Sequence, residues 1–184
     1  IAAALRLLPN DAIDLAQLGF PVPIEELAAL PHGLVLATGP TGSGKSTTLV
    51  ALAREILRRR STLLISLEDP IEQRLVAPRG SLVRQRQVGR DVASFAVGLR
   101  DALREDPDVL LIGEMRDPES IALALTAAET GHLVLTSLHS RSAASAIERI
   151  LDACPGEQRA QIRTQLADSL RAVLGQRLLP RVSG

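Results

Sequence analysis

Four short apolar runs recur along the chain, and each is nearly continuous in hydrophobicity instead of alternating with polar residues. Runs of this kind are typical of strands in a parallel sheet that is covered on both faces. We therefore predict four buried strands, at residues 34–38, 62–67, 109–113 and 132–138.

Between and after these runs, apolar residues recur at helical spacing. Pro118 stands where proline is favoured at a helix start, and Gly131 stands where a helix typically ends. Strands that alternate with helices predict an α/β fold with a mainly parallel sheet flanked by helices. The predicted helices cover residues 46–60, 93–105, 118–130, 142–153 and 157–174.

Two segments are expected to be less regular. The stretch before residue 33 contains four prolines and predicts a helix or two with turns; they are Pro9, Pro21, Pro23 and Pro31. Residues 74–89 are polar and include Pro78 and Gly80, so we expect a loop or a hairpin there.

One motif stands between the first predicted strand and the first predicted helix. It runs Gly39-Pro40-Thr41-Gly42-Ser43-Gly44-Lys45-Ser46, followed by Thr47, and matches the pattern G-x-x-x-x-G-K-[ST]. Its glycines let backbone N–H groups surround phosphate oxygens, and the helix start points its positive end at the same charge. We expect Lys45 to bridge the β- and γ-phosphates of ATP and Ser46 to bind Mg²⁺. A tight glycine turn without a ligand is the alternative, and the strand–loop–helix order disfavours it.

Acidic residues follow two of the predicted strands, where open α/β sheets bind ligands. Glu68 follows the run 62–67, and Glu114 follows the run 109–113. A carboxylate in either place can position or deprotonate an attacking water, and Glu114 can also reach Mg²⁺ through water. On these residues alone, an exposed acidic turn is the simpler interpretation of Glu68. Gly113 stands where the general Walker B strand ends in aspartate.

Histidines bracket the last predicted strand. His139 falls at its carboxyl end, on the phosphate side, where it can sense the γ-phosphate, whereas His132 begins the strand and has a structural or subunit-contact role.

Arg100 and Arg104 share one face of a predicted helix. They either form a solvated surface with their acidic neighbours or project across a subunit boundary onto phosphates, as arginine fingers do.

Composition narrows the class of protein. Equal numbers of basic and acidic residues, 21 each, and only two aromatic residues argue against a nucleic-acid surface or a base-stacking platform. Lys45 is the one lysine among the basic residues. The single cysteine, Cys154, excludes an internal disulfide and a multi-cysteine zinc site. No apolar run approaches the roughly 20 residues of a membrane span, and no signal peptide is expected.

Taken together, these motifs resemble the secretion ATPases of type II secretion and type IV pili, the GspE/PilT-like group, over most of the chain. The glycine at position 113 is normal in that group, whereas Gln87 stands where a common family pattern has glutamate. The matching segments are 39–48 (Walker A), 68–72 (Asp box), 113–117 (atypical Walker B) and 130–139 (His box).

The resemblance implies a RecA-like P-loop core with C-terminal helices. Residues 33–184 are then the ATPase domain, with its C-terminal part truncated, and residues 1–32 are a lead-in left from a linker or preceding domain. It also implies that Glu68 and Glu114 share the Mg-water and general-base work, with Glu114 favoured as the base. The family's arginines that approach the nucleotide correspond to Arg86, Arg100 and Arg104.

The same resemblance implies a cellular setting. The chain is expected to hydrolyse Mg-ATP as part of a homo-hexamer, in the cytoplasm and peripheral to the bacterial inner membrane. Its expected partners are an inner-membrane platform protein and other secretion or pilus components, without nucleic acid. The alternatives are a DNA translocase on the same RecA-like core and a nucleotide-dependent assembly module with little turnover.

Overall fold

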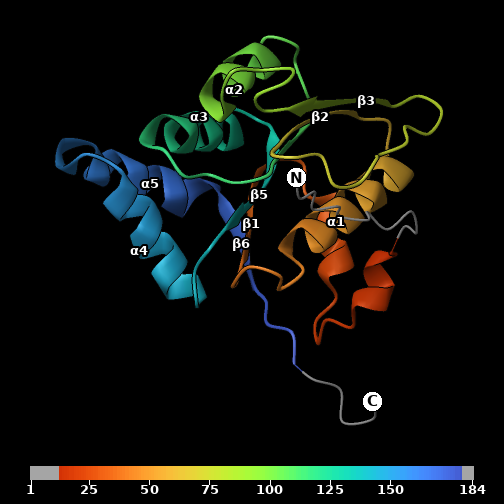
Figure 1. Cartoon of the computed structure of the whole chain (residues 1–184), viewed down its shortest axis with the longest axis horizontal. Helices are drawn as coiled ribbons and strands as arrows, with labels where there is room; N and C mark the ends of the chain where they lie inside the picture. Colours follow the sequence, from red (N-terminus) through yellow and green to blue (C-terminus); the bar gives the residue numbers. More distant parts are fainter. Residues whose placement is uncertain (1–12, 180–184) are drawn as a thin grey trace, which may run out of the picture.

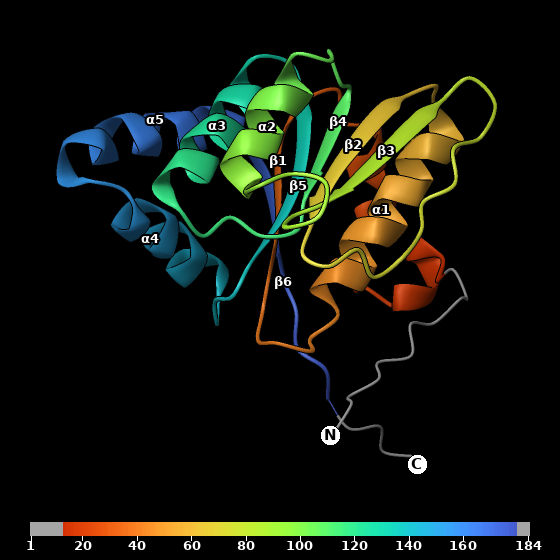
Figure 2. The ribbon, with the colours of Figure 1, turned by 45° about the horizontal axis from the view of Figure 1, so that its top comes forward.

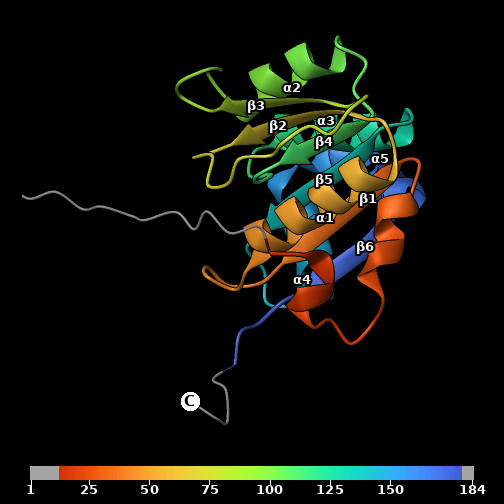
Figure 3. The same cartoon turned by 90° about the vertical axis from the view of Figure 1, so that its right-hand side faces the viewer.

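The computed structural model describes residues 13–179, and its centre is a six-stranded sheet in which all neighbouring strands run parallel. The strand order is β3-β2-β4-β5-β1-β6, as Figure 3 shows. All the carboxyl ends therefore meet at one edge of the sheet. The strands are β1 (Gly33–Thr38), β2 (Leu63–Glu68), β3 (Leu82–Gln87), β4 (Val109–Ile112), β5 (Leu133–Leu138) and β6 (Leu170–Gly175).

Helices cover both faces of this sheet (Figures 1 and 2). One face carries α1 (Lys45–Arg59) and the 3₁₀ helices η1 (Leu15–Leu18) and η2 (Ile24–Ala29). The other carries α2 (Phe95–Leu103), α3 (Pro118–Glu129), α4 (Ala143–Ala153) and α5 (Arg159–Ser169), with the short η3 (Gly156–Gln158) between the last two. The predicted α/β fold with a parallel sheet flanked by helices is thus confirmed.

Strand β1 shows why the apolar runs are continuous. Successive side chains of a strand point to opposite faces, so Leu34 and Leu36 pack in the core beneath α2–α5, whereas Val35 and Ala37 pack beneath α1. All four side chains are fully buried. The ends of such strands reach the edge of the sheet, and that is where the candidate site residues stand.

The prediction of a loop or hairpin over residues 74–89 holds for residues 74–81 and is wrong for residues 82–87. Residues 82–87 form strand β3, which pairs parallel with β2 at the outer edge of the sheet. A hairpin cannot join two parallel strands, and the connection 69–81 is instead long enough to carry the chain back to the amino-terminal edge. The alternating exposure of β3 reflects its edge position, with one face towards solvent.

The prediction of one helix over residues 157–174 is also wrong. Helix α5 ends at Ser169, and the chain continues directly as β6, which pairs parallel with β1. The turns predicted before β1 correspond to η1 and η2, while Pro9 lies outside the described residues. The domain division at residue 32 stays a prediction.

None of the helices within residues 13–179 combines the length and the apolar character that crossing a bilayer requires.

Candidate functional site

The loop between β1 and α1, residues 39–44, stands at the carboxyl edge of the sheet (Figure 2). Gly44 adopts a φ of +89°, a left-handed conformation that favours glycine, and this lets α1 begin at once with Lys45. The first turn of a helix presents unpaired N–H groups and the positive end of the helix dipole. The loop therefore has the local form of an anion site suited to phosphate.

The side chain of Lys45 folds back into this loop and is only 6% exposed. Its Nζ donates hydrogen bonds to the carbonyl oxygens of Gly39 (3.1 Å) and Pro40 (3.0 Å), and it lies 3.4 Å from Nδ1 of His139. Burial lowers the pKa of Lys45, and the charge of Glu114 partly opposes that shift. Because an ammonium group can only donate, Nδ1 of His139 accepts and its Nε2 carries the proton.

His139 also links the loop to Glu114. Its Nε2 lies 3.7 Å from Oε1 of Glu114, while Oε2 of the same carboxylate pairs with Arg116 at 2.7 Å. The Arg116 side chain is 73% exposed, so this ion pair contributes little to stability. The structure thus brings Lys45, His139 and Glu114 together from three separate elements. Their roles in a reaction stay predictions.

The backbone around Glu114 is fixed from both sides. The N–H of Gly113 donates to the carbonyl of Leu67 on β2 at 2.8 Å, and the Ser137 hydroxyl on β5 donates to the carbonyl of Gly113 at 2.7 Å. The next side chain, Met115, is fully buried in the core. The carboxylate of Glu114 is therefore held on a rigid support instead of a free loop.

The backbone of Glu68 lies beside Gly113, next to Glu114, but its carboxylate turns to other partners. Its Oε1 accepts hydrogen bonds from the Ser66 hydroxyl (2.6 Å) and from the Gln85 amide on β3 (3.0 Å). Burial raises the pKa of Glu68, and these two hydrogen bonds partly oppose the rise. In the order of the sheet, β4 and β5 stand between β2 and β1, so the structure does not bring Glu68 to Lys45.

The three predicted arginines have no contact with the loop among the described interactions. Arg86 on β3 pairs with Glu105, Arg100 on α2 pairs with Glu119, and Arg104 is exposed at the end of α2. Adjacent strands are about 4.8 Å apart, so the four spacings from β3 to β1 amount to about 19 Å. That separation exceeds the reach of one side chain, so Arg86 does not approach the loop of its own chain.

The expected magnesium ligand, Ser46, is exposed in the first turn of α1, next to the half-buried Thr47. Its hydroxyl, together with phosphate oxygens and water, makes the oxygen donor set that Mg²⁺ prefers. Within residues 13–179 no group of three or more His, Cys, Asp and Glu side chains is arranged to hold a metal ion. Ser46 therefore fits a cation that arrives with a phosphate ligand.

Two contacts at the site involve residues that the motifs did not identify. The guanidinium of Arg149 on α4 donates to the carbonyl of His139 at 2.8 Å, and the Gln176 amide donates to the Thr48 hydroxyl at 2.8 Å. In the sequence, Arg149 lies within a predicted helix and belongs to none of the motifs. Gln176 had no predicted place at the loop, because β6 was assigned to a helix.

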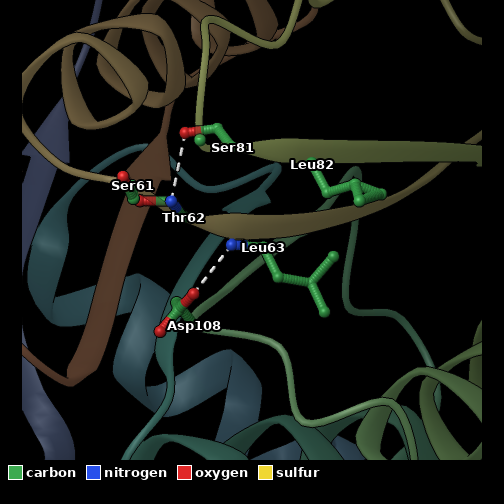
Figure 4. Close-up of a pocket in the computed structure, with 7 residues that line it drawn as sticks. Ser61, Thr62, Leu63, Ser81, Leu82 and Asp108 are labelled. Atoms are coloured by element: carbon green, nitrogen blue, oxygen red, sulfur yellow. Dashed lines mark hydrogen bonds between the residues drawn. The ribbon is translucent and has the colours of Figure 1, made fainter.

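An open pocket lies at the opposite, amino-terminal edge of the sheet (Figure 4). Its polar groups serve the backbone: Ser81 Oγ accepts from the N–H of Thr62 at 3.1 Å, and the Asp108 carboxylate accepts from the N–H of Leu63 at 2.7 Å. These bonds fix the starts of β2 and β3. The pocket is separate from loop 39–44. It is lined by residues 61–63, 80–82 and 108.

Comparison with known proteins identifies the family. A family model described as type II/IV secretion system protein matches residues 2–183. The chain belongs to this family. It is 46% identical over 182 residues to the type IV pilus retraction ATPase PilT of Pseudomonas aeruginosa, which covers 99% of this chain and 53% of that protein. It is also 46% identical over 186 residues to type II secretion system protein E of Klebsiella pneumoniae, covering 97% of this chain and 35% of that protein.

A solved structure supports the same assignment. The crystal structure of the pilus retraction motor PilT with bound ADP superposes with a TM-score of 0.92 at 47% identity, over 97% of this chain and 52% of that one. The predicted RecA-like P-loop core is thus confirmed as the fold. The chain spans about half the length of PilT.

Proposed function

We propose that this chain is the ATP-hydrolysing core of a motor that drives bacterial protein secretion or the assembly or retraction of type IV pili. The contact of Lys45, His139 and Glu114 at the carboxyl edge of the sheet carries the proposal. It joins a phosphate-binding loop to a carboxylate through one imidazole. Family membership and the likeness to ADP-bound PilT support it.

The chemistry follows from the present contacts. Phosphate oxygens are stronger acceptors for an ammonium group than the carbonyls of Gly39 and Pro40, so Lys45 turns towards the β- and γ-phosphates when ATP binds. Ser46 would hold Mg²⁺ that enters with the phosphates, and the ion would supply neutralisation of negative charge on the transferring group. The carboxylate of Glu114 orients or deprotonates the attacking water. When Lys45 turns towards the phosphates, His139 loses its contact with Lys45 and thereby registers the γ-phosphate.

The distant arginines fit a shared site between subunits. Arg86 lies on β3, four strands away from the loop of its own chain, whereas Arg100 lies on α2 and Arg104 directly follows it. We infer that these side chains act on the nucleotide of a neighbouring copy, where arginine stabilises the charge of phosphoryl transfer. A ring of identical subunits, a homo-hexamer, provides such neighbours.

We propose that the motor drives a secretion or pilus system, without choosing between the two. Equal identity to a pilus ATPase and to a type II secretion protein favours neither system. We place the motor in the cytoplasm against the inner membrane, where a membrane platform protein and other secretion or pilus components receive its motion. The neutral charge and the scarcity of aromatic side chains argue against a nucleic-acid partner.

Two measurements on the purified chain test the proposal. Titration with a fluorescent ATP analogue in the presence of Mg²⁺ is expected to show binding that Lys45→Ala weakens by about two orders of magnitude or more, since a buried charge-assisted contact is lost. Phosphate release is expected to fall about 10²-fold or more in Glu114→Gln with binding retained. The exposed Glu157→Gln is the matched control and is expected to change neither.

Several outcomes contradict this function. If ATP does not bind, or if Lys45→Ala binds it as tightly as the parent chain, the phosphate-loop assignment is wrong. Turnover that survives Glu114→Gln removes Glu114 from the base role. Stimulation of turnover by DNA favours a translocase, and binding without turnover favours an assembly module.

A further inference from the structure

The residue directly after β6, Gln176, lies against the start of loop 39–44. Its backbone N–H donates to the carbonyl of Thr38 at 2.7 Å, which extends the pairing of β6 with β1 by one step. The residue after Thr38 is Gly39, and a Cβ atom placed there would lie 2.3 Å from the carbonyl oxygen of Gln176. The two backbones are therefore in direct contact at the first glycine of the loop.

The Gln176 side chain reaches the other end of the same loop. Its Nε2 donates to the Thr48 hydroxyl at 2.8 Å. Thr48 is 1% exposed in the first turn of α1, and its own N–H donates to the carbonyl of Gly44 at 3.0 Å. One residue thus ties the strand before the loop to the helix after it.

Unpaired polar atoms accompany these contacts. Within the described part of the chain, Oε1 of Gln176 and Oγ of Ser43 are buried without a hydrogen-bond partner. The Ser43 hydroxyl lies 2.6 Å from the position of a Cβ at Gly39, so both residues pack against this glycine. Buried polar atoms are nearly always paired, and exceptions gather at functional sites. The described residues hold three other such atoms, on His32, Arg60 and Thr136, so the role of Gln176 is inferred from its contacts with the loop and with Thr48.

The location of Gln176 separates it from the proposed chemistry. Strand β1 lies between β6 and β5 in the sheet. His139 follows β5 and Glu114 follows β4, so both come from the side of β1 opposite to Gln176. A change at Gln176 therefore acts on the loop that holds the phosphates, while the groups proposed to act on water keep their supports.

We propose that Gln176 is a positioning residue that holds loop 39–44 in its phosphate-binding shape from the β6 edge. The inference rests on the proposed nucleotide-binding function and deepens it. Gln176 itself touches the loop and the first turn of α1, and through them it sets the affinity for nucleotide. Gln176 is expected to stabilise the bound nucleotide equally in the ground state and in the transition state. Its loss therefore changes KM and leaves kcat unaltered.

A double-mutant cycle tests this coupling. Gln176→Met keeps the length of the side chain and removes the amide, and Thr48→Val removes the hydroxyl that accepts from it. Binding of a fluorescent ADP analogue is expected to weaken about tenfold in each single variant, the change that one buried hydrogen bond produces. The double variant is expected to bind no more weakly than Gln176→Met alone, because both changes remove the same bond.

The control is Gln161→Met on the exposed face of α5, which makes the same chemical change far from the loop. It is expected to leave ADP affinity unaltered. In ATP turnover, Gln176→Met is expected to raise KM about tenfold at constant kcat. A residue that merely supports the fold would lower kcat as well, together with the melting temperature.

The outcomes separate the two proposals. If the parent chain does not bind ADP, the nucleotide-binding function fails. If the parent binds ADP and Gln176→Met binds it equally well, only the role of Gln176 fails. Fully additive losses in the cycle overturn the coupling through Thr48, and Thr48→Val alone decides the question if Gln176→Met does not fold.

Discussion

Replacing Gly39 with alanine is the sharpest structural perturbation of the loop. The Cβ atom would lie 2.3 Å from the backbone carbonyl oxygen of Gln176 and 2.6 Å from the hydroxyl of Ser43. Gly39 also has a φ of +154°, which L side chains rarely adopt. The serine can rotate away, but the carbonyl belongs to the β6 edge and moves only if the strand or the loop moves.

The expected cost has two parts. Forcing an extra methyl group into a packed place costs about 1–3 kcal/mol of unfolding free energy. Placing a non-glycine residue in a disfavoured backbone region costs about 1–3 kcal/mol more. Gly131→Ala isolates the second part, since Gly131 has a φ of +109° and no atom within 4 Å of its Cβ position. The difference between the two variants, about 1–3 kcal/mol, is the steric clash alone.

Urea unfolding followed by circular dichroism measures the two free energies, and titration with a fluorescent ADP analogue measures affinity. Gly39→Ala is expected to lose more stability than Gly131→Ala and to bind ADP at least about tenfold more weakly, because relief of the clash displaces the loop. Gly131→Ala is expected to retain its ADP affinity. Equal stability losses together with equal affinities would refute the contact between Gly39 and β6.

Three further changes have defined outcomes. Because burial raises the pKa of Glu68, the stabilisation linked to its protonated form is complete below the unfolded value of 4.5 and is lost as pH rises through the folded pKa. Glu68→Gln is therefore expected to unfold at a higher temperature than the parent near neutral pH, with the advantage fading in acid; an advantage that does not depend on pH contradicts this reasoning. Arg149→Gln removes the hydrogen bond to the His139 carbonyl, and we expect turnover to fall about tenfold with ADP affinity retained, whereas a loss of affinity alone would contradict the assignment. In the core, Leu36→Ala is expected to cost about 2–5 kcal/mol in urea unfolding, against less than about 0.5 kcal/mol for the exposed Leu178→Ala, and similar losses would contradict the burial of β1.

The sequence predicted those parts of the molecule that local chemistry determines. The glycine–lysine loop and the four central strands were recognisable because each needs specific residue types in consecutive positions. Strand β3 was missed because an edge strand keeps a polar face and resembles a loop in composition. Strand β6 was missed because its apolar residues continue the helical spacing of α5, and only pairing with β1 decides between the two structures.

In the candidate site, too, the residues set by local sequence could be predicted, and those set by strand pairing could not. Lys45, Glu114 and His139 stand at strand ends or in a motif, so their convergence could be expected from parallel topology. The hydrogen bond from Gln176 to the Thr48 hydroxyl joins residues 128 positions apart and depends on the order of strands in the sheet. The orientation of Glu68 towards Gln85 likewise depends on β3, which the sequence pattern did not predict.

The position of Lys45 has a practical consequence for spectroscopy. It is the only lysine in the chain, and its ammonium group is enclosed by two carbonyls and an imidazole. Isotopic labelling of lysine side chains therefore introduces a single nuclear magnetic resonance probe, which needs no assignment and sits at the proposed phosphate contact. Each nucleotide state can be followed through that one signal in an otherwise unaltered protein.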